Sequence, residues 1–341
     1  MFANSLTLPW DIGIAALLGA TGSIAAAGVL WVRKRQRPLW MKCGVLALST
    51  ASLSAFLVVV YGSFIEPQII TVTRATVTLE TPEPLRIAVI SDLHVGPYKG
   101  ARFIRRLVSR INQLQPDLVL MVGDLVLSEE VTAHDLSALE PLRNLHPVIG
   151  TYAIMGNHDH GIYRTQGVRP PDHSDVVAER ISSFGIRVLR NTSADIVSGE
   201  NVFVIAGIED ALSGDADIVQ TFSGIPRDRP TILLSHNPDV IMDPASLQAD
   251  LIVSGHTHGG QIRLPWIGPL ATLPTHIGQT FDQGLFQIGS NTTLAITRGV
   301  GESGPRARLF CPPEILLLDL YRGQGESACL RTPQHKDNDY R

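Results

Sequence analysis

The 341-residue sequence contains little cysteine and little charge. Its only cysteines are Cys43, Cys311 and Cys329, whose spacing is not that of a thiolate metal site, while a disulfide between Cys311 and Cys329 stays open. Charged residues make up 18% of the chain and the formal net charge is −4, so there is no overall basic field. Basic stretches interleaved with aromatic residues, which bind single-stranded nucleic acid, are also absent. We therefore expect no nucleic-acid partner.

What the chain has in excess is hydrophobic residues, 44% of the total, and the excess is concentrated near the start. Residues 12–32 and 43–61 contain no Asp, Glu, Lys or Arg. Each run is long enough to cross a hydrocarbon core of about 30 Å as a helix. Residues 1–65 therefore predict a membrane anchor of two transmembrane helices. A buried hairpin in a soluble core is the alternative, and a cleaved signal peptide is disfavoured because no A-x-A-like site follows the second run.

A basic cluster without acidic residues separates the two runs. Short, positively charged loops stay in the cytoplasm, so both chain ends and everything after Tyr61 are predicted to lie outside it. In a bacterium this places the anchor in the inner membrane and the large domain in the periplasm or at the outer surface. Small residues recur every four positions in the first run and predict the face that packs on the second helix. The basic residues are Arg33, Lys34, Arg35, Arg37 and Lys42, and the small ones are Ala15, Gly19, Ser23 and Ala27.

Beyond the anchor, short apolar segments alternate with helical or polar ones, which is typical of an α/β domain. Residues 66–84 form a linker in which the alternating segment 69–79 predicts an edge strand. Five later strands each end in a short polar cluster. Because sites in α/β proteins gather at the carboxyl ends of strands, this pattern indicates a functional site. The clusters are SDLH after 85–90, GDLV after 118–122, GNHD after 152–155, SHNPD after 232–234 and SGHTH after 251–253.

The polar clusters supply carboxylate, amide and imidazole groups, which suit divalent ions such as Mn, Fe or Zn. Alternate residues of a strand face the same side, so Asp92 and His94 are predicted to point at one ion. Gly123 and Gly156 permit a close backbone approach at the strand ends. Each motif alone is typical of a turn or a helix cap, whereas the ordered set indicates a metal site. The candidate ligands are Asp92, His94, Asp124, Asn157, His236, His256 and His258.

In this order, D-x-H, GD, GNH with an acidic residue, a lone His and GHxH resemble the pattern of the calcineurin-like metallophosphoesterases. The resemblance extends over residues 85–320. The longer GHTHGGQI at 255–262 is similar to a branch of membrane-associated or exported bacterial phosphodiesterases. That branch is related to the UDP-diacylglucosamine hydrolases of the lipid A pathway and to an animal transmembrane metallophosphoesterase.

The resemblance implies an α/β fold, a four-layer α-β-β-α sandwich of two mixed β-sheets, in residues 85–322. A dimetal site would lie at the carboxyl ends of the strands. Two transmembrane helices would precede the domain, and residues 323–341 would form a polar tail.

The resemblance also implies roles for individual residues. Asp124 would bridge two divalent ions, because a carboxylate offers two oxygens. His158 would donate a proton to the leaving oxygen, and Asp159 would orient or charge it. Manganese is the first choice of metal, with Fe, Zn and Mg as alternatives. One ion would bind Asp92, His94, Asp124 and His258, and the other Asp124, Asn157, His236 and His256.

The implied function is that of a membrane-anchored phosphoesterase that hydrolyses phosphodiester or related phosphate and pyrophosphate bonds by metal-activated hydroxide. An envelope or lipid-linked substrate fits the anchor. One alternative is a UDP-2,3-diacylglucosamine hydrolase of lipid A biosynthesis, although that substrate is made on the cytoplasmic side. A non-enzymatic metal-binding scaffold is the other, which a complete ligand set disfavours.

Several assignments stay open at the level of sequence. Arg298 suits either a phosphate contact or an ion pair, because the guanidinium group fits both. His160 and His276 are similarly ambiguous, and Gln261 has no assigned role. The metal, the choice between monoester and diester, and the oligomeric state are also undetermined.

Overall fold

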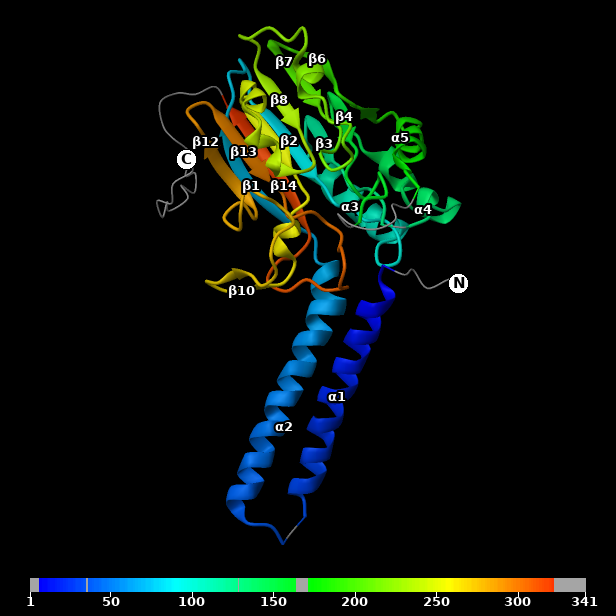
Figure 1. The fold of residues 1–341 in the computed structure, drawn as a ribbon, viewed down its shortest axis with the longest axis vertical. Coiled ribbons are helices and arrows are strands. Elements are labelled where there is room, and N and C mark those ends of the chain that lie inside the picture. Colours follow the sequence, from blue (N-terminus) through cyan, green and yellow to red (C-terminus); the bar gives the residue numbers. More distant parts are fainter. Residues whose placement is uncertain (1–5, 35, 128, 164–170, 322–341) are drawn as a thin grey trace.

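The computed structural model describes residues 6–34, 36–127, 129–163 and 171–321. Two long helices project as a hairpin from an α/β domain (Figure 1). Arg35, Cys329 and the polar tail at 323–341 lie outside the described residues, so the tail and a disulfide to Cys329 stay predictions. Cys311 itself is buried.

The two long helices are α1 at Leu8–Val32 and α2 at Leu39–Val60, and both are long and apolar enough to span a membrane. Each begins four residues before the predicted run. Prolines explain both starts, since proline fits the first turn of a helix, where its missing N–H is not needed. Pro9 lies in the first turn of α1, and Pro38 directly precedes α2. α2 leads directly into a π-helical turn, η1 at Tyr61–Ile65, and a 3₁₀ turn, η2 at Glu66–Gln68.

The face of α1 that packs on α2 is not the predicted stripe of small residues. All four residues of that stripe are exposed. Ala25 is buried instead, and a Cβ placed on Gly28 would collide with the side chain of Ser49 in α2. The prediction was wrong because small residues occur on every side of α1, so their spacing alone could not select the contact face.

The first β-sheet has six strands in the order β1-β14-β2-β3-β4-β5. β1 lies at the edge and is parallel to β14, β14 is antiparallel to β2, and the remaining pairs are parallel. The central strands β2 and β3 read LRIAVI and LVLMV, as expected of strands buried on both faces. The bounds are β1 Thr71–Thr78, β2 Leu85–Ile90, β3 Leu118–Val122, β4 Gly150–Ile154, β5 Arg187–Val188 and β14 Glu314–Tyr321.

The second sheet also has six strands, in the order β12-β13-β9-β8-β7-β6. Its four central strands are parallel, and the strand at each edge is antiparallel to its neighbour. A separate hairpin contains β10 at Arg263–Leu264 and β11 at Gly268–Pro269. The bounds of the sheet are β6 Thr192–Ser198, β7 Asn201–Gly207, β8 Thr231–Leu234, β9 Leu251–Ser254, β12 Gly284–Ile288 and β13 Thr292–Ile296.

The two sheets face each other and helices cover their outer faces, so the predicted four-layer sandwich is confirmed (Figure 1). Ile87 of the first sheet and Ile205 of the second belong to one fully buried core between the sheets. Leu107 of α3 and Phe222 of α6 belong to the two outer cores. The helices of the domain are α3 Ala101–Gln113, α4 Ala133–Ala138, α5 Ser174–Ser182 and α6 Ile218–Phe222, with 3₁₀ turns η3 Glu140–Asn144, η4 Pro238–Met242, η5 Pro244–Gln248 and η6 His258–Gly260.

Strand direction decides which end of the domain faces the two long helices. β1 begins three residues after η2, so its amino end lies at the helices. Since β14 is parallel to β1 and antiparallel to β2, the carboxyl end of β2 returns to the helices. β3 and β4 are parallel to β2, so their carboxyl ends lie at the same edge. The polar clusters that follow these strands therefore gather at the helix-proximal end of the domain (Figure 1).

Buried hydrogen bonds attach the end of α2 to the domain. The backbone N–H of Arg308 donates to the Gly62 carbonyl at 2.8 Å, and that of Cys311 donates to Glu66 Oε1 at 2.6 Å. Arg308 and Cys311 lie in the segment between β13 and β14, and the sulfur of Cys311 lies 3.3 Å from the carbonyl oxygen of the predicted ligand His258. The end of the helix hairpin is thus joined through one segment to the predicted metal site.

Candidate metal centre

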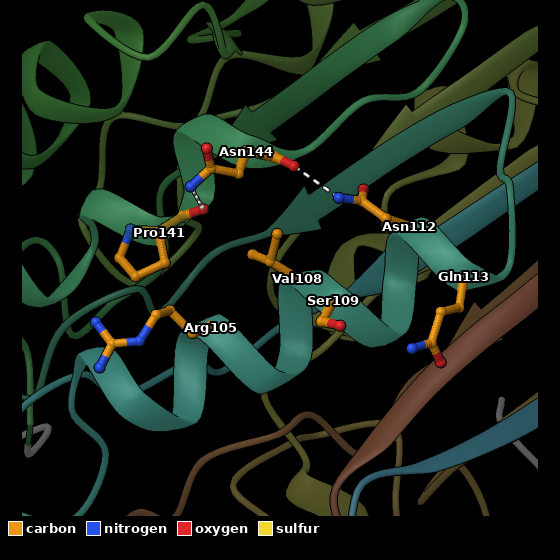
Figure 2. Close-up of a pocket in the computed structure, with 7 residues that line it drawn as sticks. All are labelled: Arg105, Val108, Ser109, Asn112, Gln113, Pro141 and Asn144. Atoms are coloured by element: carbon orange, nitrogen blue, oxygen red, sulfur yellow. Dashed lines mark hydrogen bonds between the residues drawn. The ribbon is translucent and has the colours of Figure 1, made fainter.

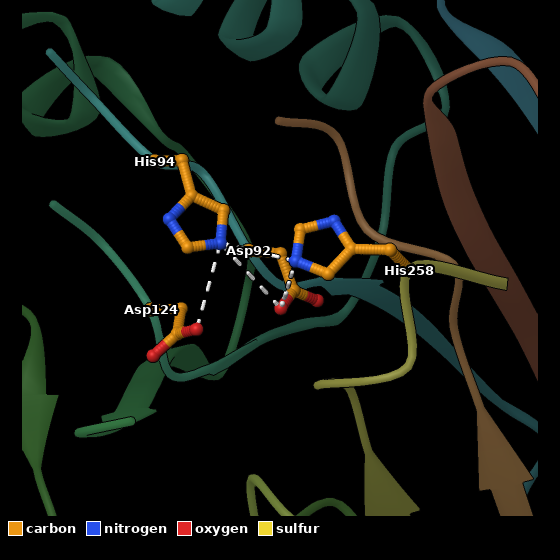
Figure 3. Close-up of side chains that lie close together, drawn as sticks. All are labelled: Asp92, His94, Asp124 and His258. Carbon is orange, nitrogen blue, oxygen red and sulfur yellow. Dashed lines mark hydrogen bonds and ion pairs between the residues drawn. The ribbon is translucent and has the colours of Figure 1, made fainter. Parts of the chain in front are cut away.

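Six carboxylate and imidazole side chains of the predicted ligand set form two buried groups that share Asp124. Within each group, one ligand atom from every residue lies within 4.8 Å of the others. The loops after β2, β3, β8 and β9 supply these residues. The first group contains Asp92, His94, Asp124 and His258 (Figure 3), and the second contains Asp124, His236 and His256.

In the first group the imidazole nitrogens face each other and the carboxylates. His94 Nε2 lies 3.1 Å from His258 Nε2 and 3.5 Å from Asp124 Oδ2. His258 Nε2 lies 3.3 Å from Asp92 Oδ1. Burial lowers the pKa of both His94 and His258 well below the ordinary value, so both rings are neutral. Neutral ring nitrogens that converge with carboxylate oxygens form a donor set for a divalent cation.

In the second group, backbone carbonyls fix which ring nitrogen points inward. His236 Nδ1 donates to the Val122 carbonyl at 2.7 Å, which leaves Nε2 3.2 Å from Asp124 Oδ2. His256 Nε2 donates to the Pro274 carbonyl at 3.1 Å, which leaves Nδ1 3.3 Å from His236 Nε2. Carbonyl partners of this kind select the tautomer of a metal-binding histidine. Burial disfavours an imidazolium, yet Asp124 outweighs burial and raises the pKa of His236 well above its ordinary value. Without a metal ion, a proton on His236 Nε2 therefore lies between this ring and Asp124.

Asn157 follows β4 and also presents an oxygen to the site. Its Nδ2 donates to the Ile162 carbonyl at 2.6 Å, and its Oδ1 is buried with no hydrogen-bond partner in the described part of the chain. Asp92 Oδ2 is buried and unpartnered in the same sense, and burial raises the pKa of Asp92 to about 7. Buried oxygens without a donor destabilise a fold unless another group satisfies them. The residues therefore fit the two divalent ions that the resemblance implies.

Five of the seven predicted ligands have left-handed backbone conformations, which residues other than glycine rarely adopt. Asp92 and His94 follow the end of β2 rather than lying in it. The strand alternation predicted for this pair is therefore wrong, and tight left-handed turns direct both side chains to the site instead. The φ angles are 53° at Asp92, 44° at His94, 54° at Asp124, 68° at His256 and 51° at His258.

Glycines around His256 and His258 allow neighbouring loops to pack closely. A Cβ on Gly255 would lie 2.7 Å from Ser91 Cβ and 2.8 Å from Asp92 Oδ2. Gly259 has a φ of 59°, and a Cβ there would lie 2.9 Å from Cys311 Sγ. These distances are shorter than van der Waals contact, so the GHTHGG turn approaches its neighbours only because glycine occupies both positions.

His158 lies beside the shared carboxylate. Its Nε2 is 3.9 Å from Asp124 Oδ2 and 3.5 Å from Ser303 Oγ, and its backbone N–H donates to Asp124 Oδ1 at 2.9 Å. Its ring is edge-on to the rings of His94 and Tyr163, with centroids 4.6 and 4.7 Å away. Burial lowers the pKa of His158. The ring is thus held next to both ligand groups with Nε2 toward Asp124.

Asp159 is not placed as the sequence predicts. Its Oδ1 accepts from the backbone N–H groups of Leu125 and Val126 at 2.9 and 3.1 Å, and its Oδ2 accepts from that of Gly156 at 2.9 Å. The carboxylate therefore ties the loop after β3 to the loop after β4 rather than orienting the His158 ring. Adjacency in sequence could not reveal this, because the direction of a side chain at a turn depends on the backbone.

Gln261, which the sequence leaves without a role, holds the loop that carries Ser303. Gln261 Nε2 donates to the Ser303 carbonyl at 2.9 Å, and its Oε1 accepts from the Ser303 N–H at 2.7 Å. This reciprocal pair fixes the Ser303 hydroxyl beside His158.

Arg298 and His276, both left open by the sequence, contact carboxylates: Arg298 in an ion pair and His276 in a hydrogen bond. Arg298 lies 3.4 Å from a Glu314 oxygen and donates to the Pro312 carbonyl at 2.9 Å. His276 is exposed and lies 2.9 Å from an Asp239 oxygen. For Arg298 the structure therefore favours the ion pair over the phosphate contact.

A charged cluster at the end of β7 was missed by the sequence reasoning. His160 Nδ1 lies 2.9 Å from Asp172 Oδ2, and its Nε2 lies 3.2 Å from Glu209 Oε2. Arg190 also pairs with Glu209. The neighbouring Asp210 is buried, and its Oδ2 has no hydrogen-bond partner among the described residues. The signal was available, because an acidic pair directly after an apolar strand repeats the pattern of the other strand ends.

We expect the protein to lose stability at alkaline pH through His160. Burial disfavours the imidazolium, but hydrogen bonds to Glu209 and Asp172 outweigh burial and raise the pKa of His160 from 6.5 to about 9. Because the folded pKa exceeds the unfolded one, the stabilisation is complete below pH 6.5 and is lost as the pH rises through about 9. With allowance for the exposure of Asp172, the charged His160 contributes on the order of 2 kcal/mol to the free energy of unfolding.

Thermal unfolding at about pH 6 and about pH 10 measures this contribution. The His160→Gln variant should show a smaller fall in Tm between these pH values than the native chain. The exposed His146 offers a matched control, and His146→Gln should behave like the native chain. An equal fall in Tm for His160→Gln and the native chain would contradict the prediction.

One surface groove lies away from the ligands. It has a volume of about 540 Å³ and is formed by α3 and η3 in the outer helical layer (Figure 2). Asn112 Nδ2 donates to the Asn144 carbonyl across it at 2.7 Å. None of the predicted ligands borders this groove, so we assign the site to the strand ends. The lining residues are Arg105, Val108, Ser109, Asn112, Gln113, Pro141 and Asn144.

Comparison with known proteins agrees with the geometry. The family model described as calcineurin-like phosphoesterase matches residues 85–260. The uncharacterized metallophosphoesterase YkuE of Bacillus subtilis is 30% identical over 295 residues, which cover 85% of this chain and 99% of that protein.

Two further relatives carry a description of their own. A transmembrane protein with metallophosphoesterase domain of Danio rerio is 32% identical over 248 residues, covering 69% of this chain and 53% of that protein. The UDP-2,3-diacylglucosamine pyrophosphatase LpxG of Chlamydia trachomatis is 28% identical over 326 residues, covering 82% of this chain and 98% of that protein.

Proposed function

Because the chain belongs to the calcineurin-like phosphoesterase family and is a metal-dependent phosphoesterase, we propose that it hydrolyses phosphodiester or related bonds in lipid-linked substrates. The observation that carries the assignment is the pair of buried ligand groups that share Asp124. Two divalent ions held there would stabilise charge on the phosphate oxygens and lower the pKa of a nucleophilic water. The mixed oxygen and nitrogen donors suit manganese, our first choice, and also Fe, Zn or Mg.

The chain's own residues hold the ions and move the leaving-group proton. We assign one ion to the first ligand group, and the other to the second group together with Asn157. We assign to His158 the proton that moves from Nε2 to the leaving oxygen, which requires the imidazolium form that the negative charge of a bound phosphate ester would favour. The Ser303 hydroxyl, 3.5 Å from that nitrogen, orients the ring. Asp159 holds the two loops that carry Asp124 and His158, through its bonds to backbone N–H groups.

Replacing His158 with glutamine should slow the hydrolysis of substrates with poor leaving groups more than that of substrates with good ones. An alkoxide needs a proton as it leaves, whereas a nitrophenolate does not. We expect kcat to fall about 10²-fold for an alkyl phosphodiester and much less for a nitrophenyl phosphodiester. Both metal ions should be retained, as measured by elemental analysis. Equal losses with the two substrates would exclude His158 as the general acid.

We propose that α1 and α2 anchor the domain in the cell membrane, with the domain on the exported side. Both helices are apolar, and the short segment that connects them is basic. Short basic loops remain in the cytoplasm. In a bacterial host, a periplasm-sensitive reporter fused after Arg341 should be active and a cytoplasmic reporter silent. The opposite result would place the domain in the cytoplasm.

The direction of the strands supports a substrate that resides in the membrane. The carboxyl ends of β2, β3 and β4, where the ligands lie, face the anchor helices. A substrate panel tests this, with lipid phosphates and nucleotide-sugar diphosphate lipids in vesicles compared with soluble phosphodiesters, each with Mn, Fe, Zn and Mg. We expect at least about a tenfold higher kcat/KM for one membrane-embedded class. A preference for soluble substrates throughout would refute the lipid-linked assignment.

UDP-2,3-diacylglucosamine hydrolysis is the second candidate function. It is favoured by the 28% identity to a protein described as a UDP-2,3-diacylglucosamine pyrophosphatase. Cleavage of that substrate, together with an active cytoplasmic reporter, would select it. A chain that binds two metal ions but hydrolyses no member of the panel would instead be a scaffold.

A further inference from the structure

We propose that the β10–β11 hairpin inserts into the surface of the membrane that α1 and α2 cross. The domain would then contact lipid at a second point, next to the metal centre. The inference rests on the proposed membrane anchor. The partner that the hairpin contacts is lipid, at the boundary between the headgroups and the acyl chains. The hairpin covers residues 263–269, and its tip is residues 264–267.

The base of the hairpin is attached to the end of the second helix. Ile262 pairs with Leu309, and the Arg263 N–H donates to the Leu309 carbonyl at 2.9 Å. The preceding residue, Arg308, donates its N–H to the Gly62 carbonyl in η1 at 2.8 Å. In Figure 1, β10 projects sideways beside the domain end of α2. The hairpin thus lies at the level where α2 would leave the membrane.

The tip of the hairpin and residues next to the hairpin expose apolar side chains. Trp266 is fully exposed and Ile267 is 71% exposed, while Leu270 and Phe310 are each more than half exposed. Residues 264–281 contain no Asp, Glu, Lys or Arg. A surface that faces water normally carries interspersed charges, whereas uncharged apolar residues with tryptophan are typical of a membrane interface.

The backbone of the tip presents the indole ring outward. Trp266 has a φ of 65°, which bulky residues rarely adopt, within a turn in which the Ile267 N–H donates to the Leu264 carbonyl at 3.2 Å. A fully exposed ring gains no packing that would offset this strain within the chain. Phe64 and Ile65 of η1 are also exposed. Exposed apolar side chains at both the helix end and the hairpin favour lipid over a protein partner as the occupant.

The hairpin is also attached to the ligand turn. Arg263 Nη1 donates to the Gly259 carbonyl at 2.7 Å, directly after the ligand His258. A Cβ on Gly260 would lie 3.3 Å from Pro269 Cα, so the turn packs against the returning strand. Insertion of the hairpin would therefore set the position of the metal ligands relative to the lipid headgroups. A lipid-linked phosphate would then reach them without its acyl chains leaving the membrane.

Fluorescence of Trp266 in a lipid bilayer tests the proposal. The chain has four tryptophans, and Trp10→Phe, Trp31→Phe and Trp40→Phe leave Trp266 alone. The full chain is reconstituted in nanodiscs of phosphatidylcholine and phosphatidylglycerol, with and without bromine on the acyl chains near the headgroup. An interfacial ring lies within about 5–10 Å of that boundary, so we expect a blue-shifted emission and roughly twofold quenching by the brominated lipid.

A matched control places the tryptophan elsewhere on the domain. Val219 on α6 is 75% exposed, and α6 contacts β6 and β7 rather than the hairpin. In the same background, Trp266→Phe with Val219→Trp should show no blue shift and no quenching. The difference in quenching between the native chain and Trp266→Phe measures the same quantity without the other three substitutions.

The outcomes separate this proposal from the proposed function. Quenching does not require catalysis, so it would persist even if no phosphoester were hydrolysed. If alkaline carbonate releases the protein from vesicles, the anchor is wrong and the hairpin proposal falls with it. If the protein stays bound but Trp266 is no more quenched than the control, only the hairpin proposal is wrong. A mass of two chains per nanodisc that Trp266→Asp reduces to one would show that the hairpin binds a second copy.

Discussion

Replacing Asp124 with asparagine is expected to abolish hydrolysis and to remove at least one of the two metal ions. Asp124 belongs to both ligand groups, with Oδ2 3.2 Å from His236 Nε2 and 3.5 Å from His94 Nε2. An amide has a similar shape but no negative charge, and its nitrogen is a donor, so it cannot bridge two cations. We expect kcat/KM to fall about 10³-fold or more. This is the upper end of the loss seen when one group that stabilises a transition state is removed.

Elemental analysis and hydrolysis of an aryl phosphodiester measure the two losses together. His256→Ala should lose metal and activity as well, because His256 belongs to the second ligand group. Asp195→Asn, which changes an exposed carboxylate on β6, serves as the control and should retain both. Two bound metal ions and full activity in Asp124→Asn would show that the ligand assignment is wrong.

Replacing Gly156 with alanine is expected to be nearly as damaging, although it adds only one methyl group. A Cβ at this position would lie 2.5 Å from the backbone nitrogen of Asp124 and 2.9 Å from its Cγ. The Gly156 N–H also donates to Asp159 Oδ2 at 2.9 Å, so the loop cannot move away without losing this bond. Either the shared ligand or the loop must shift.

We expect Gly156→Ala to destabilise the fold by about 1–3 kcal/mol, as overpacking does in other buried positions. A displaced ligand should lower kcat about 10²-fold. Thermal unfolding, metal content and turnover measure these effects. Gly100 is the matched control, because its φ is −123° and a Cβ there would meet nothing within 4 Å. Gly100→Ala should cost less than about 1 kcal/mol. Native stability and activity in Gly156→Ala would show that the loops repack freely.

The grouping of the candidate ligands was predictable, because it follows from which residue types stand directly after the strands. Apolar runs identify the strands, and Asp, Asn and His directly after them identify the strand ends that carry ligands. The division of the ligands between two ions came from the resemblance to a family, and the structure groups the carboxylates and imidazoles in the same way.

Side-chain direction at the turns was not predictable. Asp92 and His94 reach the site through left-handed turns rather than through strand alternation. Asp159 bonds to backbone N–H groups from two loops, although it is adjacent to His158 in sequence. Gln261 gains its role only from Ser303, which lies 42 residues away along the chain. Each of these depends on contacts that a local pattern does not contain.

The sequence by itself determined two long apolar helices, an α/β domain and a set of candidate ligands, because these follow from local composition and residue chemistry. Only the tertiary structure decided that the ligands face the helix end of the domain. That orientation follows from the parallel pairing of β1 with β14 and the antiparallel pairing of β14 with β2, which join strands at opposite ends of the domain sequence. Another long-range pairing, that of Ile262 with Leu309, brings the hairpin with its uncharged tip beside the end of α2.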